Sequence, residues 1–160
     1  MSSFLEIYLQ DHHAGSTGGL EIAKRTAKAN GGTEFGGPLT RLAGEIGEDR
    51  DALKRIMARL DVNPAPVKAA LAWAAEKAGR VKPNGQIRGY SPLGRLVEIE
   101  ALVTGVSGKL SLWRALKQVA PSEPRLDAVQ LADLEGRAED QLTRLHELRD
   151  RAATIAFVTS

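Results

Sequence analysis

Apolar residues recur at spacings of three and four along four long stretches of the chain, a pattern that predicts amphipathic α-helices. The most regular stripe follows Pro38 and is interrupted at one position by a carboxylate, Asp49. Its members are Leu39, Leu42, Ile46, Asp49, Leu53, Ile56 and Leu60. No stretch alternates between apolar and polar residues in the way typical of a half-buried strand. The sequence therefore predicts an all-α fold.

Proline and glycine mark where these helices begin and end, because both residues disfavour a helix interior. The run Asn30-Gly31-Gly32 ends the first helix, and Pro38 is the residue type favoured at the first position of the second. Ser91 and Asp127 are plausible N-caps for the last two long helices. We expect long helices over about 3–29, 38–60, 92–119 and 126–158, and a short helix over about 67–78.

The lengths of the connections predict how the helices are joined. Short links between the first two and between the last two long helices are typical of antiparallel hairpins. The link over 61–90 is much longer and matches the length of a 25-residue helix, about 38 Å. It can therefore run from one end of the bundle to the other, which makes the second and third long helices parallel. Two hairpins joined by one crossover form the ferritin-like four-helix bundle, here expected as a single domain over residues 1–160.

The opening segment Tyr8-Leu9-Gln10-Asp11-His12-His13-Ala14-Gly15-Ser16, together with this helix order, resembles the small uncharacterised bacterial proteins of the ferritin-like superfamily. For di-iron members of that superfamily the resemblance implies a Glu on two helices and a Glu-x-x-His pair on each of the other two. The residues three positions before His12, His13 and His146 are Leu9, Gln10 and Thr143. Because no Glu-x-x-His occurs, ferroxidase chemistry is not expected.

Asp49 requires a polar partner if its stripe is buried. Counting residues outward from the two hairpin turns places it in one interior layer with Glu100 and His146. A second layer would hold Asp11, His12, Arg114 and Glu135. Carboxylate and imidazole groups at one level suit a divalent ion such as iron or manganese. The other interpretation, which we favour, is a buried salt-bridge network that fixes helix register.

Two further features have alternative explanations. His13 lies off the main stripe of its helix and is expected on the surface. Glycines recur inside the helices, at Gly15-Gly18-Gly19, Gly44-Gly47 and Gly105-Gly108. We expect them to allow close approach of helix backbones or to leave room for Trp73 and Trp113 against the bundle, and the alternative is space for a small ligand of unknown identity.

Composition narrows the possible functions. Lys and Arg total 22 against 20 Asp and Glu, a net charge of +2 that gives no broad footprint for nucleic acid. The absence of Cys excludes disulfides and thiolate metal sites. No targeting segment and no apolar run long enough to span a membrane is visible, so we expect a cytoplasmic protein. Four apolar residues outside the best stripes predict a homodimer: Leu71, Trp73, Leu112 and Leu116.

These observations favour a non-catalytic interaction or scaffold protein without a cofactor. The alternative is a metal-binding protein or oxidase that uses an atypical carboxylate and histidine set. A third possibility is a binder of a small apolar or anionic ligand.

Overall fold

The computed structural model describes residues 3–64 and 90–158. These residues form four long helices and one 3₁₀ turn: α1 (Ser3–Ala29), α2 (Gly36–Arg59), α4 (Pro92–Val119), η1 (Ala120–Ser122) and α5 (Ala128–Phe157). No strand occurs over the two described ranges, so the all-α prediction is confirmed. The short helix expected over 67–78, with Leu71 and Trp73, lies outside the described residues.

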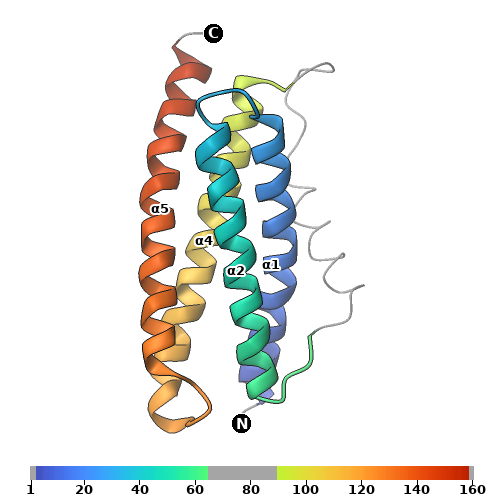
Figure 1. Ribbon diagram of the computed structural model, residues 1–160, viewed down its shortest axis with the longest axis vertical. Coiled ribbons are helices and arrows are strands. Elements are labelled where there is room, and N and C mark those ends of the chain that lie inside the picture. Colours follow the sequence, from blue (N-terminus) through green and yellow to red (C-terminus); the bar gives the residue numbers. More distant parts are fainter. Residues whose placement is uncertain (1–2, 65–89, 159–160) are drawn as a thin grey trace.

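The four long helices lie side by side along one axis (Figure 1). Helices α1 and α5 run in one direction, and α2 and α4 run in the other (Figure 1). Helix α1 packs against both α2 and α4, and α4 packs against α5. Side chains bridge α2 and α5, for example from Arg59 Nη2 to Gln130 Oε1 at 2.6 Å. Because α2 and α4 run in the same direction, they are parallel, as the unequal connection lengths predict.

Local hydrogen bonds explain where the helices begin. The Ser91 hydroxyl accepts a hydrogen bond from the backbone N–H of Gly94 at 2.9 Å. The Asp127 carboxylate accepts from the N–H groups of Val129 and Gln130. Helix α2 begins at Gly36, before the expected Pro38, and its first turn lies so close to Asn30 that a Cβ at Gly36 would be 2.6 Å from the Asn30 carbonyl oxygen.

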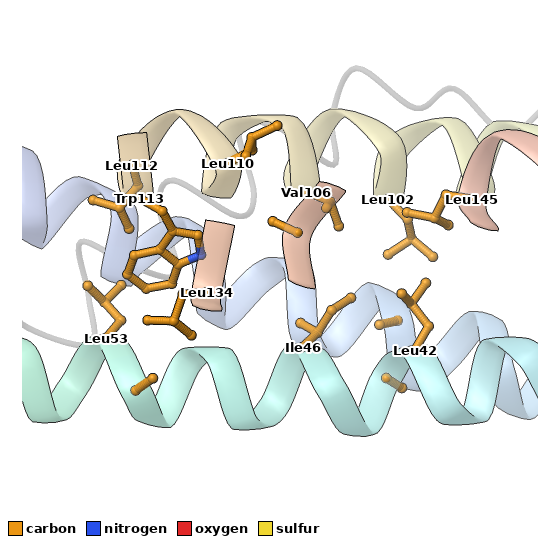
Figure 2. Packing of buried hydrophobic residues seen from close by; sticks show 14 of the residues in the cluster. Leu42, Ile46, Leu53, Leu102, Val106, Leu110, Leu112, Trp113, Leu134 and Leu145 are labelled. Atoms are coloured by element: carbon orange, nitrogen blue, oxygen red, sulfur yellow. The ribbon is translucent and has the colours of Figure 1, made fainter. Parts of the chain in front are cut away.

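The predicted apolar stripes meet in one core between the helices. In Figure 2, the Trp113 indole of α4 points toward the side where Leu53 of α2 and Leu134 of α5 lie. Leu112 and Leu116, expected as extra surface for a dimer, are 1% and 0% exposed. Their burial removes them as a reason to expect a homodimer. No described helix combines the length and apolar character needed to cross a membrane.

Five of the helical glycines do not mark close backbone contacts with the part of the chain that the structure describes. A Cβ built at Gly19, Gly44, Gly105 or Gly108 would meet no atom of the described chain within 4 Å. At Gly47 a Cβ would make an ordinary contact, 3.8 Å from Leu20 Cδ1. The expected close approach is therefore wrong at these positions.

A buried polar layer as the candidate functional site

One polar cluster interrupts the apolar core, and it contains Asp49 of α2, Lys109 of α4 and Gln141 of α5. The side chain of Asp49 has no exposed area, and that of Lys109 is 14% exposed. Lys109 Nζ donates hydrogen bonds to Asp49 Oδ2 and Gln141 Oε1, both at 2.5 Å. Gln141 Nε2 donates to the same Asp49 oxygen at 3.0 Å. We call these three residues the Asp49 layer.

Charged side chains extend the layer toward the surface along the seam between α2 and α5. Arg137 Nε lies 2.9 Å from Asp49 Oδ1, an ion pair without good hydrogen-bond geometry. The same guanidinium donates to Glu48 Oε2 at 2.8 Å. Glu45 Oε2 accepts from Gln141 Nε2 at 3.2 Å and from Arg144 Nη2 at 2.5 Å. The buried carboxylate of Asp49 is thus compensated by cations of the protein itself.

The electrostatic environment follows from burial and from these pairs. Burial lowers the pKa of Lys109, and the neighbouring Asp49 carboxylate opposes that effect. Burial also acts to raise the pKa of Glu45, but the hydrogen bond and charge of Arg144 outweigh it, so the pKa of Glu45 lies below its usual value. The charged forms in the layer therefore depend on one another.

All three residues of the layer occupy the same position in the spacing of their helices: each lies three residues after one buried residue and four residues before another. Asp49 continues the α2 stripe, Lys109 lies between the buried Val106 and Trp113, and Gln141 lies between the buried Ala138 and Leu145. Lys109 and Gln141 were not predicted, because a search for apolar stripes passes over a lysine and a glutamine, and beside Gln141 it selects Leu142, which is half-buried. Strict alternation of three and four through Leu131, Leu134 and Ala138 leads next to Gln141 and would have found it.

The expected layer of Asp49, Glu100 and His146 is corrected by the structure. Asp49 is buried as predicted, but Glu100 and His146 are both exposed. Each follows a fully buried residue, Ile99 or Leu145, and one step along a helix turns a side chain by about 100°. These two side chains therefore lie on outward faces.

The second expected layer also divides into separate contacts. Asp11 is exposed, and the half-buried His12 ring meets the Tyr8 ring edge-on at 4.5 Å. Glu135 pairs with Arg114 at 2.9 Å and with Lys117. Within 3–64 and 90–158, no three His, Asp or Glu side chains form a group that could hold a metal ion. The surroundings of Asp49, an ammonium and a guanidinium, do not fit a di-metal centre.

His13 is buried, with 8% of its area exposed, so its expected surface position is wrong. Its Nε2 atom has no hydrogen-bond partner within the described residues. Burial lowers the pKa of His13, and the charges of Arg50 and Lys54 on α2 lower it further. The neutral imidazole is therefore the form that the fold accommodates.

An open groove of about 330 Å³ lies between the first turns of α2 and the second half of α5. Arg41, Arg144 and Arg151 line it together with Glu147. Arg144 pairs with Glu45 and Asp140, and Arg151 lies 3.5 Å from Glu34. Most of the positive charge beside the groove is therefore already compensated.

The chemistry available to the Asp49 layer is limited by its own hydrogen bonds. A general acid or base must reach a substrate proton, whereas the Lys109 ammonium is directed at Asp49 and Gln141. Comparison with protein families, curated proteins and solved structures found no match for this chain. Its function is accordingly inferred from the layer and from the exposed surface.

Proposed function

We propose that this chain is a non-catalytic helical bundle of ferritin-like arrangement that serves as an interaction or scaffold module. The observation that carries the proposal is the pairing of the buried polar groups with one another. The Lys109 ammonium lies 2.5 Å from both Asp49 Oδ2 and Gln141 Oε1. A buried pair of this kind favours one arrangement of helices, and its polar groups are engaged with one another.

The ferritin-like part of the proposal is supported by the parallel α2 and α4 helices and by the two ends of the long connection. Near its start, the Asn63 carbonyl accepts a hydrogen bond from Gln10 Nε2 at 3.1 Å. At its end, the Tyr90 hydroxyl accepts one from Asn30 Nδ2 at 2.9 Å. Gln10 lies in the first half of α1 and Asn30 directly follows its last residue, so the two described ends of the connection lie near opposite ends of that helix.

The interaction part is supported by apolar side chains exposed at a helix end. Phe157 and Val158, at the C-terminus of α5, are 70% and 75% exposed. This end of α5 projects past the neighbouring helices (Figure 1). Contiguous exposed apolar surface is a feature of contact sites, and these two side chains are neighbours in the sequence. The proposed partner is a second copy of the chain, in a cytoplasmic homodimer formed through this end.

Elemental analysis of protein purified without chelator tests the absence of a metal role. We expect iron, manganese and zinc well below one equivalent per chain. One equivalent of any of them would overturn the non-metal proposal and would support the metal-binding alternative, which stays a prediction.

Light scattering at micromolar concentration tests the homodimer. We expect the mass of a dimer for the parent and of a monomer for Phe157→Ser/Val158→Ser. Val129→Ser is the matched control, because Val129 is 72% exposed at the opposite end of α5. A monomeric mass for the parent would contradict the proposed dimer.

A further inference from the structure

The Asp49 layer joins the two helical hairpins. Asp49 belongs to the α1–α2 hairpin, whereas Lys109 and Gln141 belong to the α4–α5 hairpin. Within each hairpin, a short turn fixes how far along one another the helices lie. Between the hairpins no such turn exists, since α2 and α4 are joined by the long connection. Side-chain contacts must therefore fix the axial alignment of one hairpin against the other.

The apolar stripes are poorly suited to fix this alignment. Seven residues to either side of Asp49, Lys109 and Gln141 stand only leucine and isoleucine: Leu42, Ile56, Leu102, Leu116, Leu134 and Leu148. All six are at most 3% exposed. A slip of seven residues, about 10 Å along the axis, would set a leucine or isoleucine opposite each member of the layer, so the apolar positions themselves do not oppose the slip.

The ion pairs on the surface of the α2–α5 seam do not distinguish one axial alignment of the hairpins from another either. Arg137, Arg144 and Arg151 pair with Glu48, Glu45 and Glu34. The three arginines are themselves spaced by seven residues. After a slip of one heptad, arginines of α5 would again lie beside these glutamates.

We propose that the Asp49 layer selects the alignment of the two hairpins. The leucine stripes drive the hairpins together, and the layer determines where along one another they stop. In a slipped arrangement the Asp49 carboxylate would face leucine, and Lys109 would face Leu42 or Ile56. Asp49 and Lys109 would then lose each other, and Lys109 would keep only Gln141 of its own hairpin as a partner in the layer, so the buried ion pair would be broken, which is strongly unfavourable. This inference goes beyond the proposed function and holds whether or not the bundle binds a partner.

The absence of cysteine in the chain allows a direct measurement of the alignment. Spin labels attached through Arg55→Cys on α2 and Asp133→Cys on α5, both exposed positions, report the distance between the hairpins by pulsed electron paramagnetic resonance. We expect one narrow distance population in the parent. In Asp49→Leu/Lys109→Leu/Gln141→Leu we expect a second population from hairpins displaced by a heptad, with the helical circular dichroism signal retained.

The matched control is Glu34→Leu/Arg151→Leu, which replaces an ion pair whose side chains are 57% and 51% exposed. It should keep the single parental population. A single parental population in the triple variant would overturn the proposal. If the triple variant loses its helical signal, Asp49→Leu/Lys109→Leu decides: a second population supports the proposal, and a single parental one overturns it. Loss of helical signal in both variants also overturns it, because the leucine stripes would then be insufficient for docking.

Discussion

Replacing Asp49 with alanine is expected to destabilise the fold by about 3 kcal/mol. The Lys109 side chain is 14% exposed in the parent, and after the substitution its remaining partner in the layer is Gln141 Oε1. Removing one member of a buried ion pair typically costs about 3–5 kcal/mol. The lower end applies here because Arg137 is 34% exposed and keeps its contact with Glu48.

Two matched variants separate the contributions. Asp49→Asn removes the charge and keeps a hydrogen-bond acceptor, and Glu48→Ala removes a member of an exposed ion pair instead of a buried one. Asp49→Asn keeps an oxygen that accepts from Lys109, so we expect a smaller loss of about 1–2 kcal/mol. Glu48→Ala removes a carboxylate that is 69% exposed, and its cost should stay below about 1 kcal/mol. Urea unfolding followed by circular dichroism gives each value, provided that the slope of free energy against urea stays constant.

The double variant Asp49→Leu/Lys109→Leu tests whether the loss arises from the unpaired charge, because it removes both members of the buried ion pair. Replacing both members of a buried pair with apolar residues is often neutral or stabilising, so we expect it to unfold at a urea concentration close to that of the parent. A loss below about 0.5 kcal/mol for Asp49→Ala would refute the reasoning, because it falls short of the cost of leaving a buried charge unpaired.

Three further predictions concern other parts of the bundle. The pKa of His13 lies below 6.5 in the fold, so the unfolded chain binds the extra proton and the free energy of unfolding should fall as pH drops below about 6.5. Urea midpoints measured between pH 8 and pH 5 should depend less steeply on pH in His13→Gln than in the parent. Gly44→Ala and Gly105→Ala, at open helical positions, should each stabilise by about 0.5–1 kcal/mol in thermal unfolding, whereas Gly36→Ala should destabilise because of its clash with Asn30. Asp127→Ala should cost about 1 kcal/mol in the same assay, and an unchanged melting temperature would show that the cap of α5 contributes nothing.

Much of the fold follows from local signals in the sequence. Proline at the start of α4 and the cap at Asp127 define helix starts because they act through the nearest backbone groups. The stripe through Asp49 is regular enough to predict burial of a charged residue, which is 1% exposed. Each of these features depends on residues close in sequence.

The partners of Asp49 could not be predicted in the same way. Counting outward from the turns placed Asp49 near Glu100, whereas it contacts Lys109, about 2.5 helical turns further along α4. No turn connects α2 to α4 directly, so the count had no fixed origin for this pair. The faces of Glu100 and His146 were also misjudged, because a level along the axis says nothing about rotation around it.

The distances along the chain between members of the Asp49 layer have a consequence for folding kinetics. Lys109 and Gln141 lie 60 and 92 residues from Asp49, whereas the Arg114–Glu135 pair within the α4–α5 hairpin spans 21 residues. Closing longer loops costs more entropy, so the hairpins are expected to form first and the layer to close after the rate-limiting step. Asp49→Ala should then accelerate unfolding and leave the refolding rate nearly unchanged in stopped-flow measurements. On this basis the layer determines how long the folded bundle persists, and the local hairpins determine how quickly it forms.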